Sequence, residues 1–493
     1  MTPLHAHRSP DPSPRSGRRT PWSTVWALAL PLLLAACASA PPSNPTANLM
    51  AVPATWSAAP LASAGAPASD ITGWWTGFQD AQLTALVDQA LRANTSVKSA
   101  QAALRQARAL ADVQQAGLGP SVSASGSAQR SRSGTSAASN SFSAGFDASW
   151  EPDIFGGNRA AVDATEADAQ ASAASLANTQ VSLAAEVASA YINLRGLQTR
   201  LAIAHTNLDT QSETLQITRW RAQAGLASAL DVEQAVSAME QTRAQVPALQ
   251  TSVTQALNAL AVLTGKAPGQ WGDTLAAAAP VPSAPTGLAL AFPADTLRQR
   301  PDVLAAERRV EAALARVAVA DAARYPSFRL SGSLGLSALT LGSLTDSASL
   351  VRSLLASVSA PLFDGGATQA QVRAQQAAMA QTLASYESTI LTALQDVEDA
   401  LVAIQGDAER LERLQTAAHA AAKAELLAQQ RYTSGLIDFA TVLTTQRTLL
   451  SVQDSVASAQ TSLSASHVRL YKALGGGWKP DTPATLAVKT AQP

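Results

Sequence analysis

The sequence consists of two similar halves. Leu91–Val97 aligns with Leu297–Val303 at a separation of about 206 residues, and Gly225 aligns with Gly435 at about 210. Two short insertions account for this drift, and chance matches in an alanine-rich chain would not hold one register for so long. We therefore predict two structural repeats, at 73–265 and 294–478, joined by a linker at 266–293.

A long helix is expected in each repeat. Between Asn158 and Ala224 there is no proline and only one glycine, Gly196, so one helix of about 100 Å is predicted at 158–224. Its counterpart is expected at 368–433. The hydrophobic residues are mostly small, because only 4% of the chain is aromatic, and this suits close helix packing. A heptad seam follows residues spaced by four and three: Leu183, Val187, Ala190, Leu194, Leu197, Leu201, Ala204 and Leu208. A helix of this length must project from any compact domain.

Two strands are expected before each long helix, at about 120–130 and 141–152 and at about 326–336 and 349–361. From Phe328 to Leu336, apolar residues and glycine alternate with serine, arginine and glycine. This period of two is typical of a membrane β-barrel strand, with one face toward lipid and the other toward a wet interior. An amphipathic hairpin packed on a soluble core is the alternative reading.

The N-terminus has the features of a targeting segment. Four arginines precede an apolar stretch from Val25 to Ala36, which predicts a signal peptide at 1–36. Cys37, the only cysteine, ends this stretch as in the lipobox of bacterial lipoproteins, so we expect it to be lipidated. An ordinary small residue within the apolar stretch is the alternative. Ala38, where an Asp would imply retention in the inner membrane, implies the outer membrane. A flexible tether at 37–72 and a C-terminal tail at 479–493 complete the chain.

Several function classes fit the sequence poorly. A net charge of −1 gives no electrostatic case for nucleic acid, and a single cysteine excludes an internal disulfide. We predict no metal site and no cofactor. Glu151 and Asp153 lack a matching carboxylate pair in the other half, and neither Gly-Gly pair is followed by a phosphate-loop lysine. No nucleophile–base arrangement was found, so the chain is not expected to be an enzyme.

Four strands cannot close a barrel, and lipid does not tolerate an open sheet edge. Two copies would supply eight strands and three copies twelve. An eight-stranded barrel is filled by its own side chains, whereas the inward residues here are small and polar. Three copies around an open lumen are therefore favoured.

These features resemble the TolC family of outer-membrane efflux channels. The resemblance rests on the repeat order, Arg300-Pro301-Asp302-Val303, Leu362-Phe363-Asp364-Gly365-Gly366 and the two Gly-Leu turns. The lipobox and Trp74-Trp75 resemble the lipoprotein, NodT-type branch. The resemblance implies a homotrimer with a twelve-stranded barrel in outer-membrane lipid and a twelve-helix periplasmic tunnel. It also implies passive export of small compounds, in partnership with a periplasmic adaptor and an inner-membrane pump. A lipid-tethered structural coiled-coil protein of the envelope, without transport activity, is the alternative.

The resemblance also assigns roles to residues at the two helical turns. Gly225, Leu226, Gly435 and Leu436 would form the adaptor-docking tip. Asp231 and Tyr432 match residues of the gate that closes the tunnel. Three positions depart from the family pattern, namely Ile437, Thr441 and Thr444. Asp438 is a candidate replacement for a missing ring charge, although the sequence favours reading it as a solvated turn residue.

Overall fold

The structure, a computed structural model, describes residues 56–57, 71–284, 297 and 299–479. The chain divides into two units, Met1–Leu49 and Met50–Pro493, and every described residue belongs to the second, to which this description is confined. The predicted signal peptide and Cys37 lie outside the described residues, as do most of the tether and the tail.

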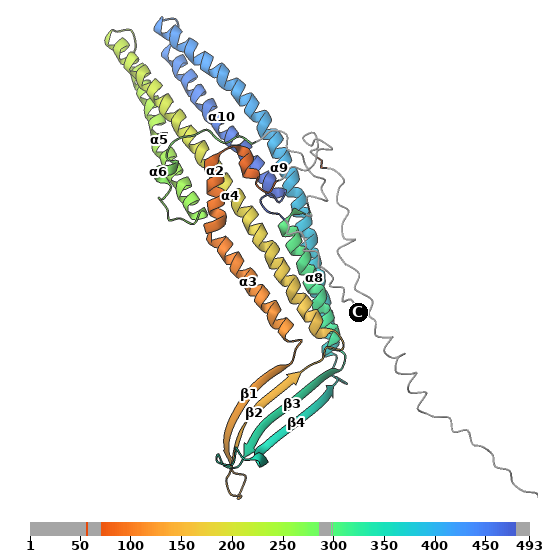
Figure 1. The fold of residues 1–493 in the computed structure, drawn as a ribbon. Helices are drawn as coiled ribbons and strands as arrows, with labels where there is room; N and C mark the ends of the chain where they lie inside the picture. The colour runs from red at the N-terminus through yellow and green to blue at the C-terminus, as the bar shows by residue number, and fades with distance from the viewer. Residues whose placement is uncertain (1–55, 58–70, 285–296, 298, 480–493) are drawn as a thin grey trace, which may run out of the picture. The chain divides into compact units, whose positions relative to one another are not determined.

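Each repeat runs helix, strand, strand, long helix, helix (Figure 1). Shorter elements open the first repeat or lie in connections: the 3-10 helix η4 (Trp74–Phe78), α2 (Ala81–Ala93), α6 (Gly272–Leu275) and the 3-10 helix η5 (Ser347–Ser349). The first repeat comprises α3 (Thr95–Ala116), β1 (Ser121–Ser131), β2 (Ser139–Trp150), α4 (Gly157–Gln223) and α5 (Ala229–Leu263). The second comprises α8 (Pro301–Ala322), β3 (Ser327–Ala338), β4 (Leu350–Ser359), α9 (Ala367–Thr433) and α10 (Phe439–Ala473). The ends of the long helices and strands lie within about two residues of the expected ranges, because local periodicity determines them.

The four strands form one antiparallel sheet in the order β1-β2-β3-β4. The central pair, β2 with β3, joins the two repeats. There Gly145 lies opposite Gly335, and a side chain on Gly145 would begin 2.8 Å from the Cα atom of Gly335. The two backbones therefore approach closely at the junction between the repeats.

The register separates the two faces of the sheet. Phe142, Phe146 and Leu334 lie on one face, and Ser143 and Asp147 lie on the other. The alternation expected for barrel strands is thus present in the paired sheet. It leaves one apolar face and one polar face.

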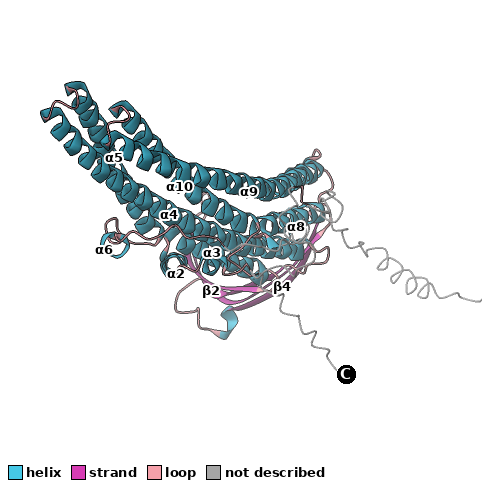
Figure 2. Cartoon of the chain, turned by 90° about the horizontal axis from the view of Figure 1, so that it is seen from above, coloured by secondary structure: helices cyan, strands magenta, loops and turns pink. Residues whose placement is uncertain are grey.

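The long helices run side by side, away from the sheet (Figures 1 and 2). Helix α4 packs against α3, α5, α8 and α10, whereas α9 packs mainly against α8 and α10. Small residues allow this packing: 13 alanine and valine side chains line the buried side of α4, among them Ala184, Val187 and Ala188. Helix α9 has a much more exposed surface than α4.

The largest core lies where η4, α2 and α4 meet. Trp74 stacks on Tyr471 with a 5.1 Å separation of the ring centroids, and Leu83 and Tyr191 are fully buried. Arg195 is also buried, donating to the side chain of Gln198 and to the carbonyl of Ala277. Its two terminal nitrogens find partners, which lets this charged side chain lie inside the core, whereas its Nε has none among the described residues.

The expectation of a flexible tether across 37–72 is wrong at Trp56 and Ser57. Trp56 is buried among α9 and α10 residues, including Val397 and Leu470. The backbone amide and hydroxyl of Ser57 each donate to the carboxylate of Glu398, both at 2.7 Å. One large aromatic ring thus provides enough apolar burial to hold this point of the tether against the helices.

Candidate functional site

Two matching turns form the ends of the helical hairpins. After α4, Gly225 has a φ of 72°, and the amide of Leu226 donates to the carbonyl of Arg221 at 2.7 Å. After α9, Gly435 has a φ of 74°, and the amide of Leu436 donates to the carbonyl of Arg431 at 2.9 Å. Glycine ends each helix because it adopts the left-handed conformation at little cost.

Each turn presents an exposed leucine. Leu226 is 69% exposed and Leu436 is 74% exposed, although both are large and apolar. The two turns lie at the end of the helices remote from the sheet (Figure 1). The structure therefore places all four predicted docking residues at one end of the molecule, with their apolar side chains available to a partner.

Asp231 caps α5. Its carboxylate accepts the backbone amide of Ser228 at 2.9 Å and the Ser228 hydroxyl at 2.8 Å, while its own amide donates to that hydroxyl. Asp438 is itself the N-cap of α10, at the position that Ser228 holds in α5, and its carboxylate accepts the amide of Thr441 at 2.9 Å. The hydrogen bonds from Thr441 hold the pKa of Asp438 below its usual value.

Tyr432 is buried and does not meet Asp231. Its hydroxyl has no hydrogen-bond partner among the described residues. Instead the guanidinium of Arg221 lies 4.5 Å from the centre of its ring and donates to its backbone carbonyl at 2.9 Å. Phe439 packs on the ring from α10, at 5.5 Å between centroids. Arg221, which the sequence reading did not single out, thus joins the two hairpins at the tip.

Polar pairs connect α4 to α10 below the tip. Gln446 donates to Thr214 at 2.9 Å, and both side chains are buried. Nearer the sheet, Arg200 makes a two-point ion pair with Asp454, at 2.6 and 3.1 Å. These pairs fix the register between the two hairpins, because each needs one side chain from each repeat.

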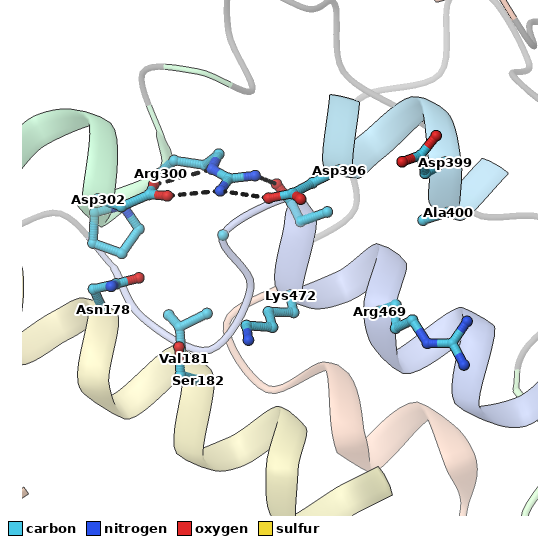
Figure 3. A pocket seen from close by; sticks show the side chains of 13 residues that line it. Asn178, Val181, Ser182, Arg300, Asp302, Asp396, Asp399, Ala400, Arg469 and Lys472 are labelled. Carbon is cyan, nitrogen blue, oxygen red and sulfur yellow. Dashed lines mark hydrogen bonds and ion pairs between the residues drawn. The ribbon is translucent and has the colours of Figure 1, made fainter. Parts of the chain in front are cut away.

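Apart from the tip, a cluster of charged side chains surrounds Arg300 at the start of α8 (Figure 3). Its guanidinium makes two hydrogen bonds to Asp302, at 2.6 and 3.0 Å, one to Asp396 at 3.0 Å and one to the carbonyl of Ala473 at 2.9 Å. Burial alone would lower the pKa of Arg300, but these carboxylates outweigh that effect and raise it. The motif Arg300-Pro301-Asp302 therefore ties α8 to α9 and α10.

A cavity of about 500 Å³ adjoins this network. Asn178 and Ser182 of α4 line it, as do Asp399 of α9 and Arg469 and Lys472 of α10 (Figure 3). Acidic and basic side chains therefore share the cavity, and the hydrogen bonds across its edge are those of Arg300.

No metal or membrane-helix signal accompanies these sites. Within the described residues, no group of three or more His, Cys, Asp or Glu side chains is placed to hold a metal ion. Among the helices of the described part, none combines the length and apolar character needed to cross a membrane.

Comparison with known protein families shows to which family the chain belongs. Residues 86–266 and 292–476, one segment in each repeat, match the family model described as outer membrane efflux protein. The chain belongs to the outer membrane efflux protein family. The resemblance to TolC-like outer-membrane efflux channels is thereby confirmed.

Similar proteins support membership of this family along nearly the whole chain. The chain is 36% identical over 469 residues to the pyoverdine export outer membrane protein OpmQ of Pseudomonas aeruginosa, covering 91% of this chain and 96% of that protein. It is 32% identical over 478 residues to nodulation protein T of Rhizobium leguminosarum bv. viciae, covering 94% and 97%. The solved structure of the outer-membrane channel OprN superimposes with a TM-score of 0.83 at 34% identity, covering 90% of this chain and 100% of OprN.

Proposed function

We propose that three copies of this chain form the outer-membrane exit duct of a tripartite efflux system. The strands would close a twelve-stranded barrel in the membrane, and the long helices would continue its lumen as a periplasmic tunnel. An inner-membrane pump and a periplasmic adaptor would deliver small compounds to the tip. The duct itself would supply no energy.

The strands support ring closure. β1 pairs with β2 and β3 pairs with β4 inside the repeats, while β2 pairs with β3 between them. The equivalent of this last pairing would join β4 to β1, which are the two edges of the described sheet. A neighbouring copy can make that pairing, and an unpaired edge would be costly in lipid.

The helices, like the strands, lack contacts in one repeat that their counterparts make in the other. α8 packs on α9 within its repeat and on α4 of the other repeat, whereas its counterpart α3 packs on α4 and has no extensive contact with α9 in the described chain. Leu110 and Val113 of α3 are 54% and 65% exposed, and Val402 of α9 is 61% exposed. These apolar side chains lie where a neighbouring copy would cover them.

The polar face of the sheet favours three copies over two. Its residues in β2 and β3 are mainly small, including Ser143, Gly145 and Ser331. Such side chains cannot fill an eight-stranded barrel, whereas twelve strands would enclose a water-filled lumen.

The tip would both dock the adaptor and control the tunnel. Exposed Leu226 and Leu436 supply apolar surface, and the adjoining glycines allow close approach of another backbone. Asp231 and Tyr432 remain our proposed gate residues, and the Arg221–Tyr432 contact adds a link between the hairpins. Lipidation of Cys37 would add a second attachment to the outer membrane.

The exit-duct proposal rests chiefly on the unpaired β1 and β4 edges. Its test is the mass of the purified protein in detergent, together with current through a planar lipid bilayer. A trimer with discrete single-channel steps is expected. A water-soluble monomer without conductance would instead support a tethered scaffold protein and refute the duct.

A further inference from the structure

The apolar face of the sheet carries arginines near its outer end. Arg130 is the last residue but one of β1, and Arg352 is the third residue of β4; Arg132 directly follows β1. Arg130 and Arg352 share the face of Phe146 and Leu334, as the strand registers show. All three side chains are exposed. An arginine in contact with lipid is costly at mid-membrane and tolerated only near the headgroups.

These arginines lack carboxylate partners. The side chains of Arg130 and Arg352 make no ion pair or hydrogen bond within the described residues, and the side chain of Arg132 donates only to the carbonyl of Ser136, at 3.1 Å. The only acidic residue on the four strands, Asp147, lies on the opposite face. The charge on the apolar face is therefore uncompensated.

The internal repeat predicts how β4 pairs with β1 of the partner subunit. Within the repeats, Val122–Ala148 corresponds to Phe328–Val358, so β1 and β3 differ by about 206 positions and β2 and β4 by about 210. The observed pair between the repeats is Phe142 with Ala338. A shift of about 210 positions forward takes Phe142 of β2 to Arg352 of β4. A shift of about 206 positions back takes Ala338 of β3 to Arg132.

The pairing across the junction thus sets Arg352 opposite Arg132 of the partner subunit. The observed neighbour pair, Ala144 with Leu336, converts in the same way into Leu354 with Arg130 of the partner subunit. Three arginines from two copies then gather at one point of the lipid-facing surface. Like charges directly opposite each other destabilise a strand pair, so an anion bound at this cluster would stabilise the junction.

We propose that each junction binds a lipid headgroup of the outer leaflet whose phosphate groups carry a net negative charge, through Arg130 and Arg132 of one copy and Arg352 of the next. The inference rests on the proposed trimeric barrel. The cluster lies toward the hairpin ends of the sheet, remote from the helices (Figure 1), which is the side of the outer leaflet. Arginine suits this role because its planar fork donates two parallel hydrogen bonds to a phosphate. A trimer would contain three such sites.

The test compares the wild type with Arg130→Gln/Arg132→Gln/Arg352→Gln in neutral phosphatidylcholine vesicles and in vesicles containing a diphosphorylated glycolipid. The readout is the temperature at which the trimer dissociates. In neutral lipid we expect the triple variant to dissociate at a higher temperature than the wild type, because the repulsion is gone. In phosphorylated lipid we expect the order to reverse. Each arginine near an anionic surface strengthens lipid binding about fivefold. The triple variant should therefore bind the glycolipid about a hundredfold more weakly than the wild type.

Arg329→Gln is the matched control, because Arg329 lies on the other face, 3.6 Å from Glu151, and its loss should leave the lipid dependence unchanged. The proposal is overturned if the wild-type trimer dissociates at the same temperature in both lipids. It is also overturned if the glycolipid raises the dissociation temperature of the triple variant as much as that of the wild type. Stabilisation by inorganic phosphate in neutral lipid would overturn the lipid assignment. Wild-type conductance in neutral vesicles tests the duct separately, and its absence there would count against the proposed function alone.

Discussion

Gly196 of α4 faces Thr461 of α10 so closely that an added methyl group would overlap the threonine hydroxyl. We expect Gly196→Ala to destabilise the protein by about 1–3 kcal/mol, since it overpacks a contact between the two repeats. Denaturant unfolding measures this. Gly406, the counterpart in α9, has no atom within 4 Å of an added methyl group in the described chain. Gly406→Ala should therefore not destabilise an unassembled protomer, because alanine favours the helix, and equal losses in both variants would contradict the explanation.

The same correspondence predicts a contact between subunits. A shift of about 210 positions converts Gly196–Thr461 into Gly406 with Thr251 of the partner subunit. In a Cys37→Ala background, Gly406→Cys/Thr251→Cys should form a disulfide between copies on mild oxidation. Denaturing electrophoresis would then show linked dimers and trimers. Gly406→Cys alone is the control, and a failure of the pair to cross-link above that level would remove this contact.

The tip should resist opening. We expect Asp231→Ala/Tyr432→Phe to raise the closed-state conductance in planar bilayers, because both residues occupy proposed gate positions. Unchanged conductance would end the gate assignment. Arg221→Gln should also raise it, since the variant loses the cation–π contact with Tyr432, a contact that contributes about 0.5–2 kcal/mol.

Docking should depend on the exposed leucines. Leu226→Asp/Leu436→Asp should abolish efflux in cells while leaving the single-channel conductance of the purified protein intact, because both side chains are exposed. Val262→Asp replaces a 62% exposed residue at the far end of α5 and should retain efflux. Normal efflux in the leucine double variant would exclude these side chains from docking.

The Arg300 network should contribute to stability. Arg300→Gln leaves two carboxylates without their cation, and breaking a buried pair costs about 3–5 kcal/mol. We expect the lower end of this range, because Asp396 is about half exposed. Arg308→Gln removes a partly exposed pair with Glu311 and should cost less than about 1 kcal/mol. Thermal unfolding distinguishes the two, and similar losses would contradict the assigned role of burial.

Local patterns made much of this fold predictable. The long helices and the strands follow from periods of 3.6 and 2, and Gly225 and Gly435 mark the turns because helix ends favour glycine. The internal repeat supplied the order of the elements. Apart from the repeat, each of these signals lies within a short stretch of sequence.

Contacts between distant residues were not predictable in this way. Arg221 and Tyr432 lie 211 positions apart, and nothing near either residue indicates the other. Trp56 is a single aromatic residue in a segment rich in Ala, Pro and Ser, with no periodicity to indicate that it packs on α9. Asp231 matched a family gate residue, yet its carboxylate is occupied by Ser228, a local alternative that the match did not reveal.

The hairpins of the two repeats are equal in length: α4 and α9 each have 67 residues, and α5 and α10 each have 35. In the proposed trimeric ring of alternating repeats, an insertion in one hairpin alone would leave three helix ends above the other three. Evolution can therefore change the reach of such a tunnel only by paired insertions or deletions, one in each half of the gene.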